Sequence, residues 1–241
     1  MLSLFFLWKE EEMIGDKRVL AIIPARGGSK RLPKKNIRLF DELPLILHSV
    51  NAAKGCNYID ELIVSTDCDE IAKVATNADC KVDIRSSKLS SDDATTIDVL
   101  KDLLSRFDNF DVVVTLQPTS PLRTAKDIEN CLNLFAQKNA DAIASVCMTA
   151  HPPQWINCLG SNGEMDDFVD EAAKNKRSQD LGEYFLLNGA VYCNCVKTLM
   201  MSDAIILDQN IYGYVMPRNR SVDIDTLEDF ELAEFYLKRA K

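Results

Sequence analysis

Histidine is scarce in this sequence of 241 residues, which contains only His48 and His151. Neither belongs to an H-E-x-x-H pattern, which argues against a zinc-dependent hydrolase. The eight cysteines are scattered without repeated close pairs, and no histidine stands beside them to complete a zinc site. One short spacing, Cys193 and Cys195, lies in an alternating apolar run that predicts both side chains on one face of a strand. We interpret the cysteines as reduced thiols, which favours a cytoplasmic protein.

A long hydrophobic run is also missing. The apolar stretch Leu2–Trp8 is too short to span a bilayer, has no basic segment before it, and is followed by charged residues rather than a cleavage site. We therefore predict no membrane segment and no signal peptide, and expect residues 1–17 to be a disordered extension, with Met13 as an alternative start. Basic residues number 28 against 37 acidic ones, a net charge of -9, which argues against nucleic acid or an anionic membrane as a partner.

The remainder of the sequence alternates between short apolar runs and amphipathic segments. The runs are rich in β-branched residues and predict buried parallel strands, while the segments between them predict helices. The expected strands are 18–25, 61–67, 111–117 and 141–148, and the expected helices are 44–54, 69–78, 95–107 and 124–138. This alternation predicts an α/β fold: a doubly wound, mostly parallel sheet with helices on both faces, in a single domain over residues 18–241.

Ligands of such sheets bind beyond the carboxyl ends of the strands, where three polar loops of this sequence are expected to meet. They read ARGGSKRLPKKN, STDCDE and QPTSPLR. The first matches neither the phosphate loop of ATPases nor the G-x-G-x-x-G dinucleotide fingerprint. Its Gly27 and Gly28 permit positive φ, so backbone N–H groups can turn toward phosphate oxygens. We interpret it as a phosphate cradle, with a glycine turn and a solvated basic loop as the alternative. Its cations are Arg26, Lys30, Arg31, Lys34, Lys35 and Arg38, of which Lys34 and Arg38 are expected to face solvent.

Two further sites stand out near predicted strand ends. Gln117 ends an apolar strand, where its amide would project into the rim, whereas Ser120 and Thr124 read equally well as helix N-caps. Asp223 and Asp225 alternate along a strand-like stretch, so both can point to one side and offer oxygen ligands to Mg²⁺. The alternative is a pair of solvated acids, with Thr226 capping a helix over residues 227–239.

Five motifs, in order, carry a resemblance to a known family: IIPARGGSKRLPKKNI, VSTD, LQPTSPLR, LNGAVY and SVDIDTLEDF. Over about residues 18–240 the chain resembles the acylneuraminate cytidylyltransferases, which make CMP-activated sialic and legionaminic acids. The resemblance implies a fold of the nucleotide-diphospho-sugar transferase type. It also implies transfer of CMP from CTP to the anomeric hydroxyl of a nine-carbon acidic sugar, with release of pyrophosphate and a need for Mg²⁺. The general base is left open between a metal-bound water and an aspartate.

The resemblance also implies roles for individual residues. The nucleotide would be held by Arg26, Gly27, Ser29, Lys30, Lys35, Asn36, Arg85 and Thr96. The sugar would be bound by Gln117, Ser120, Arg123, Arg177, Gln179 and Asn188. Asp223 and Asp225 would bind the metal and, with Arg26 and Lys35, carry the catalysis.

Residues 151–182 would form a protruding arm that crosses to a second copy of the chain in a homodimer and helps to complete its sugar site. The alternative is a surface excursion that folds on its own subunit.

Three positions depart from the family pattern. Arg31 stands where most relatives have glycine, in a spelling that Kdo cytidylyltransferases share, while Gln154 and Leu186 stand where some relatives have lysine and arginine. The last two make the sugar's identity open among N-acetylneuraminate, legionaminate, pseudaminate and Kdo. A non-catalytic sugar-nucleotide binding protein on the same fold is the alternative of a different class, and the intact acid pair favours an enzyme.

Overall fold

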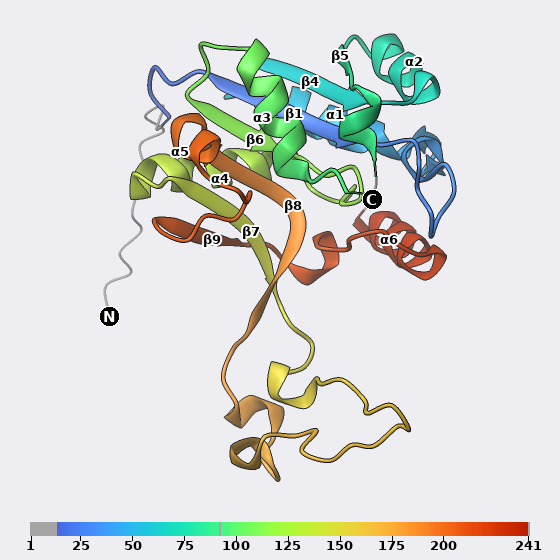
Figure 1. Cartoon of the computed structure of the whole chain (residues 1–241), viewed down its shortest axis with the longest axis vertical. Coiled ribbons are helices and arrows are strands. Elements are labelled where there is room, and N and C mark those ends of the chain that lie inside the picture. Colours follow the sequence, from blue (N-terminus) through green and yellow to red (C-terminus); the bar gives the residue numbers. More distant parts are fainter. Residues whose placement is uncertain (1–13, 92, 241) are drawn as a thin grey trace.

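The computed structural model describes residues 14–91 and 93–240, and its centre is a seven-stranded sheet. The strands lie in the order β5-β4-β1-β6-β8-β7-β9, and β8 alone runs against its neighbours β6 and β7 (Figure 1). Their bounds are β1 Val19–Ala25, β4 Glu61–Thr66, β5 Lys81–Ile84, β6 Val112–Thr115, β7 Ala142–Met148, β8 Phe185–Cys195 and β9 Ile211–Val215. A small hairpin pairs β2, Leu39–Phe40, with β3, Leu43–Pro44.

Helices cover both faces of this sheet. They are α1 Leu45–Lys54, α2 Asp69–Asn77, α3 Thr96–Arg106, α4 Ala125–Lys138, α5 Val196–Met201 and α6 Leu227–Ala240. Alternate residues of β1 divide between the two layers: Val19, Ala21 and Ile23 pack with α1, α2 and α4, and Leu20 and Ile22 pack with α3 and α5. The predicted doubly wound, mostly parallel sheet is therefore confirmed.

All four predicted strands and all four predicted helices form, because each run is long enough to show its period. The helix expected over residues 227–239 forms as α6, and the alternation around Cys193 correctly placed that residue on a strand, while the other elements are not predicted individually. Of the predicted extension over residues 1–17, residues 1–13 lie outside the described part of the chain. Within the described part Ile14 is buried against the main core, so the ordered fold begins earlier than residue 18.

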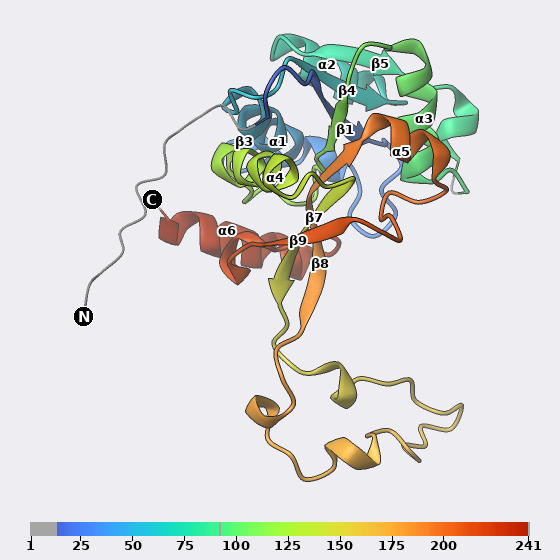
Figure 2. The ribbon, with the colours of Figure 1, turned by 90° about the vertical axis from the view of Figure 1, so that its left-hand side faces the viewer.

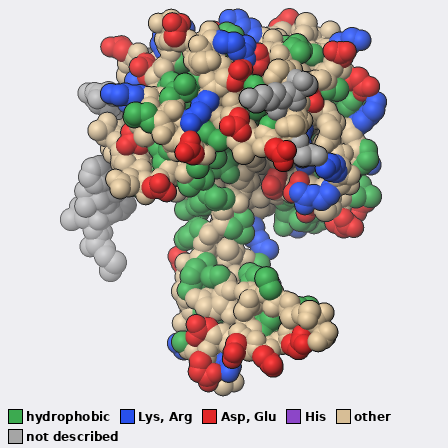
Figure 3. Space-filling view, viewed as in Figure 1, with side chains coloured by type: hydrophobic (Ala, Val, Ile, Leu, Met, Phe, Trp, Pro, Cys, Tyr) green, Lys and Arg blue, Asp and Glu red, His purple; other side chains and the backbone are tan. Residues whose placement is uncertain are grey.

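Between β7 and β8 the chain leaves the body as a long arm that contains only 3-10 turns (Figures 1 and 2). The stem is a two-stranded ribbon in which Met148 pairs with Phe185 and Cys147 pairs with Leu186. Apolar side chains are exposed along the stem, including Leu187 at 51% exposure, and they form an apolar band where the arm meets the body (Figure 3). Within the described residues, no helix has the length and apolar character needed to cross a bilayer.

The C-terminal segment returns across the carboxyl ends of the strands to reach α6. Helix α6 packs through Phe230 and Ala233 against Phe40 and Leu45, which forms a third apolar cluster beside the sheet. Thr226 caps this helix as predicted: the Thr226 hydroxyl accepts from Asp229 N at 3.3 Å, and the Asp229 carboxylate accepts from Thr226 N at 2.8 Å. This packing brings the segment that precedes α6 to the rim of the sheet.

The capping box of α4 includes an ion pair whose carboxylate is buried. Thr124 and Asp127 form the box, and the Asp127 carboxylate also accepts two hydrogen bonds from Arg220, at 2.7 and 3.2 Å. Burial raises the pKa of Asp127, but the bonds from Arg220 and Thr124 outweigh burial and hold that pKa below its usual value. The pair joins α4 to the segment that leads into α6.

We predict that Asp127→Asn lowers the free energy of unfolding by about 2 kcal/mol, because the buried carboxylate loses its charge-assisted hydrogen bonds from Arg220, whose own side chain is 36% exposed. The matched control is Asp98→Asn, at the same position of the exposed capping box of α3, where the expected loss is about 1 kcal/mol. Because the folded pKa of Asp127 is depressed, its contribution is present above the unfolded pKa and disappears as pH falls through the folded value. Urea unfolding at several pH values measures both effects, and equal losses in the two variants would contradict the prediction.

Candidate active site

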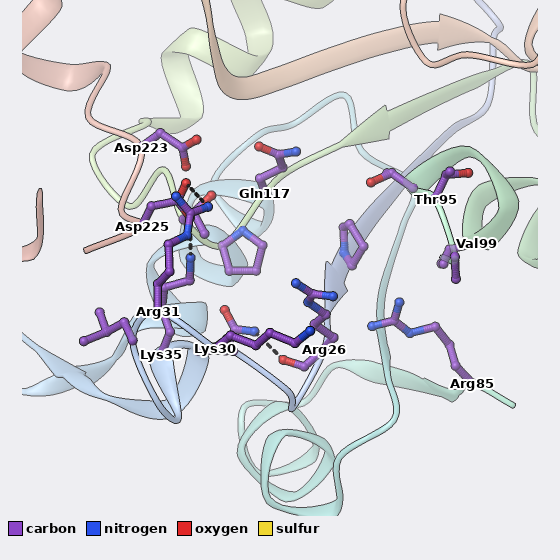
Figure 4. A pocket seen from close by; sticks show the side chains of 18 residues that line it. Arg26, Lys30, Arg31, Lys35, Arg85, Thr95, Val99, Gln117, Asp223 and Asp225 are labelled. Carbon is purple, nitrogen blue, oxygen red and sulfur yellow. Dashed lines mark hydrogen bonds and ion pairs between the residues drawn. The ribbon is translucent and has the colours of Figure 1, made fainter. Parts of the chain in front are cut away.

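A cavity of about 640 Å³ opens at the carboxyl ends of β1, β5 and β6, where the sequence predicts a ligand site. It brings together the loop after β1, the residue after β5, the start of α3, the loop after β6 and the segment before α6. The charged side chains on its wall are Arg26, Lys30, Arg31, Lys35, Arg85, Asp223 and Asp225 (Figure 4). Five cations therefore face two carboxylates in a chain that is acidic overall.

The loop after β1 is held by contacts to its neighbours. Gly27 N donates to Asp67 Oδ1 at 2.8 Å, and Asn36 Nδ2 donates to the Arg26 carbonyl at 2.9 Å. Neither Gly27 nor Gly28 has the positive φ that the sequence suggested. Glycine is required at 27 for another reason: a Cβ there would lie 2.8 Å from the Cβ of Cys68. Gly27 thus lies beside the loop after β4, which contains Asp67 and Cys68, and not on the cavity wall. Its N–H group already donates to Asp67.

Two cations of this loop contact the acid pair. Lys35, with a side chain only 11% exposed, donates to the Ile224 carbonyl at 2.7 Å and pairs with Asp225 Oδ1 at 3.0 Å. Arg31 pairs with Asp225 Oδ2 at 2.7 Å, a contact that the sequence did not indicate. Both contacts connect the loop after β1 with the segment before α6. They therefore hold together, at the cavity, two segments that lie far apart in the sequence.

Two further cations of this loop, Lys34 and Arg38, point away from the cavity. Lys34 pairs with Glu70 at 2.9 Å, which raises the Lys34 pKa through that hydrogen bond. Arg38 lies over the ring of Phe230, 5.2 Å from its centre. Both were expected at the solvent, and neither lines the cavity, so their charges serve local contacts on the outside of the loop.

The acid pair lies on an extended segment that belongs to no sheet. Ile224 N donates to the Thr119 carbonyl at 2.8 Å, which fixes this segment to the loop after β6. The Ile224 side chain is fully buried while Asp223 and Asp225 face the cavity, so the predicted alternation holds. Burial raises the pKa of Asp223, a hydrogen bond from Thr119 lowers it, and the nearby Asp225 charge raises it further.

These carboxylates suit Mg²⁺ in one specific way. Among the described residues, no group of three or more histidine, cysteine or acidic side chains could hold a metal alone. Mg²⁺, however, is commonly bound by one or two carboxylates together with substrate phosphates. Asp223 reaches the cavity surface, but partial desolvation disfavours its charged form, so it would gain from a cation at this position. The pair therefore fits a metal that arrives with a phosphorylated substrate.

Arg85 lies across the cavity from the acid pair (Figure 4). Its backbone N donates to the Thr66 carbonyl at 2.8 Å, so the position of the residue is fixed by the sheet. Its Nε and Nη2 atoms are buried and have no hydrogen-bond partner, and burial lowers the pKa of the guanidinium. Unsatisfied buried donors on a cation are costly, so this end of the cavity requires an acceptor.

The predicted sugar-binding residues divide into two groups. Gln117 lines the cavity, whereas Ser120, Arg123 and Asn188 are buried behind it, at most 3% exposed. Arg123 donates to the carbonyls of Gln117 and Ala190, and Ser120 donates to the Asn188 carbonyl. The structure therefore places these three residues where they position the Gln117 loop against β8 without touching the cavity.

Gly189 supplies the space for the Gln117 side chain. It has a φ of +71°, and a Cβ built on it would overlap Gln117 Oε1. The remaining predicted sugar ligands, Arg177 and Gln179, are exposed on the arm and do not line the cavity of this chain.

Several cavity residues were not predicted. Thr95 and Val99 stand beside the predicted Thr96 at the start of α3, and Pro118 and Thr119 follow Gln117. The capping pattern of Thr95 and the position of residues 118–119 after a predicted strand are signals that would have found them. Ser29, Asn36 and Thr96 line the wall as expected.

Two of the departures from the family pattern lie on the arm and its stem. Gln154 donates from Nε2 to the Tyr184 hydroxyl, and its Oε1 is buried without a partner. Leu186 is 45% exposed on the stem. Neither residue lines the cavity, so both departures lie outside the part of the site that this chain forms by itself.

Solved structures with a similar fold include CMP:2-keto-3-deoxy-manno-octonic acid synthetase in complex with CTP, at a TM-score of 0.70 and 18% identity, over 93% of this chain and all of that one. Another is 4-diphosphocytidyl-2C-methyl-D-erythritol synthase from Anaerococcus prevotii, at a TM-score of 0.66 and 16% identity, over 95% of this chain and all of that one. At such identities the likeness shows the fold alone.

Sequence relatives are closer. N-acylneuraminate cytidylyltransferase of Streptococcus agalactiae serotype V is 33% identical over 88% of this chain, which spans 51% of that protein's length. CMP-N,N'-diacetyllegionaminic acid synthase of Legionella pneumophila is 34% identical, over 90% of this chain and 95% of its own. Pseudaminic acid cytidylyltransferase of Campylobacter jejuni is 34% identical, over 91% of this chain and 96% of its own. The family model described as cytidylyltransferase matches residues 20–234, so the chain belongs to the cytidylyltransferase family, as the five motifs predict.

Proposed function

We propose that this protein transfers CMP from CTP to the anomeric hydroxyl of a nine-carbon acidic sugar of the N-acetylneuraminate or legionaminate type, releasing pyrophosphate with the help of Mg²⁺. The observation that carries the proposal is the distribution of charge in one cavity. Arg85, with two buried unsatisfied donors, lies at one end, the cations of the loop after β1 lie between, and the acid pair lies at the other end (Figure 4). The named relatives act on sugars of this class.

The nucleotide fits this distribution from end to end. Arg85 and Thr96 would take the cytidine, since the orphan Nε and Nη2 donors of Arg85 match the acceptors of a base or ribose. Arg26, Ser29, Lys30, Lys35 and Asn36 would hold the triphosphate. The role of Gly27 is indirect, because its N–H binds Asp67.

The transfer step builds negative charge on the bridging and leaving oxygens of the α-phosphate. Arg26 and Lys35 would stabilise that charge, and Lys35 is already held in place by the Ile224 carbonyl, so little reorganisation is needed. Asp223 and Asp225 would hold Mg²⁺, which when bound neutralises charge on the phosphate oxygens. The protein's eight free thiols suit a cytoplasmic enzyme.

The sugar would lie beside Gln117. Arg177 and Gln179 can take part only if the arm of a second copy reaches this cavity, so the proposed sugar site includes a homodimer. The exposed apolar band on the stem supports that assembly, because Met148, Phe185 and Leu187 are each at least 44% exposed. Pseudaminate is the second candidate sugar, since its cytidylyltransferase is as similar to this chain as the legionaminic acid synthase.

We predict that the purified protein releases pyrophosphate from CTP when Mg²⁺ and one of four sugars are present: N-acetylneuraminate, legionaminate, pseudaminate or Kdo. The expected result is a CMP-sugar with the first or second of these. A coupled pyrophosphate assay with mass spectrometry of the product measures it, and ATP in place of CTP is the control. CTP binding without product from any sugar would contradict the proposal, and product from pseudaminate alone would select the second candidate.

We predict that Asp223→Asn and Asp225→Asn each lower kcat by a factor on the order of 100 or more while changing CTP affinity much less, because the metal's contribution is largest in the transition state. Glu70→Gln is the matched control, since Glu70 borders the same loop but faces Lys34 on its outer side. Steady-state kinetics and CTP titration separate the two effects. Turnover close to that of the unmodified protein in either aspartate variant would contradict the metal assignment.

We predict that Gly189→Ala raises KM for the sugar by about tenfold or more with little change in KM for CTP, because the new methyl group displaces Gln117 Oε1. Gly15→Ala is the control for backbone strain alone: Gly15 has a φ of +61°, and a Cβ added there would have no neighbour within 4 Å. If the loss passes through Gln117, adding Gln117→Ala to Gly189→Ala costs little more. Equal kinetics for the two glycine variants would contradict this role.

A further inference from the structure

Among the cations that line the cavity, Arg31 is the one to which neither the family pattern nor the proposed function gives a role. Its side chain is 69% exposed, and its Nη2 lies 2.7 Å from Asp225 Oδ2, inside the cavity wall (Figure 4). Asp225 is one of the two carboxylates that the proposed function assigns to the metal. An exposed arginine therefore contacts an oxygen that the metal would need.

Both oxygens of Asp225 are engaged, but by cations of different freedom. Lys35 lies on Oδ1 at 3.0 Å and is also bound to the Ile224 carbonyl at 2.7 Å, with a side chain only 11% exposed. Moving Lys35 would break two hydrogen bonds and loosen the contact between the loop after β1 and the segment before α6. Arg31 can leave Oδ2 by rotating its exposed side chain into water, and exposed ion pairs of this kind are weak.

A divalent cation on Asp225 Oδ2 competes with the Arg31 guanidinium for the electron density of that oxygen, and the two positive charges repel each other. A metal that uses Asp225 through Oδ2 therefore favours displacement of the exposed Arg31, while the enclosed Lys35 stays in place. Because Arg31 lines the same cavity, its displaced guanidinium remains beside the region assigned to the triphosphate. Both the metal and the nucleotide then favour the displaced position of Arg31.

We propose that Arg31 is a positioning residue that occupies the metal-facing oxygen of Asp225 in the ligand-free protein and yields it when the metal arrives with its nucleotide. This inference rests on the proposed function, because it takes Asp225 as a metal ligand. Arg31 lowers the affinity for the free ion, and by thermodynamic reciprocity it couples metal binding to nucleotide binding.

The test measures Mn²⁺ binding to the full chain without nucleotide, using the electron paramagnetic resonance signal of the free ion. Arg31→Gln is expected to bind Mn²⁺ roughly two- to fivefold more tightly, the effect of removing one exposed ion pair. Arg31→Lys, which keeps the charge, is expected to return the affinity toward that of the unmodified protein. Lys34→Gln removes the same charge from the same loop, but Lys34 pairs with Glu70, so a much smaller change is expected.

Equal or weaker Mn²⁺ binding by Arg31→Gln would overturn the proposal, as would an equal gain in Lys34→Gln, which would mark a general charge effect. In an Asp225→Asn background the effect of Arg31→Gln is expected to vanish, and its persistence there would also overturn the proposal. The product assay separates the two hypotheses. If CMP-sugar forms but Arg31→Gln leaves the Mn²⁺ affinity unchanged, this inference alone fails. If no sugar reacts but Arg31→Gln raises the Mn²⁺ affinity, the proposed function fails and this inference stands.

Discussion

The Lys35 ammonium group is the contact on which the cavity depends. It bonds the Ile224 carbonyl and the Asp225 carboxylate, residues that lie about 190 positions later in the chain. It adds to two other described contacts between the loop after β1 and the segment before α6, the apolar cluster that contains Leu32, Val222 and Ile224 and the ion pair of the exposed Arg31. Because the ammonium is nearly buried, its charge must stay paired, and this requirement fixes both the loop and the acid pair at once.

The same contact explains how an acidic protein maintains a basic cavity. Five cations face two carboxylates there, so the wall carries a local excess of positive charge in a chain of net charge -9. Such an arrangement attracts a small polyanion to one spot. The electrostatic argument from composition and the geometry of the cavity therefore agree on the class of ligand.

Much of this could be predicted from the sequence, and the exceptions have physical causes. The strands and helices with a full period were found, while the four-residue β5 was not, and β8 was predicted only around Cys193 and Cys195 and without its reversed direction, since short or antiparallel insertions leave little pattern. Motif resemblance selected Ser120, Arg123 and Asn188 as part of the site, but it does not say which way a side chain points. All three turn inward, where Arg123 is so completely enclosed that burial lowers the pKa of its guanidinium to about 9.

These buried side chains hold the surrounding segments of the site in place. Asn188 Nδ2 donates to Ser221 Oγ at 2.9 Å, two residues before Asp223, and Ser120 donates to the Asn188 carbonyl beside Gly189. One buried hydrogen-bond network therefore fixes the positions of both the acid pair and the Gln117 loop relative to β8. Because β8 continues directly into the stem of the arm, this buried network connects the stem with the cavity wall.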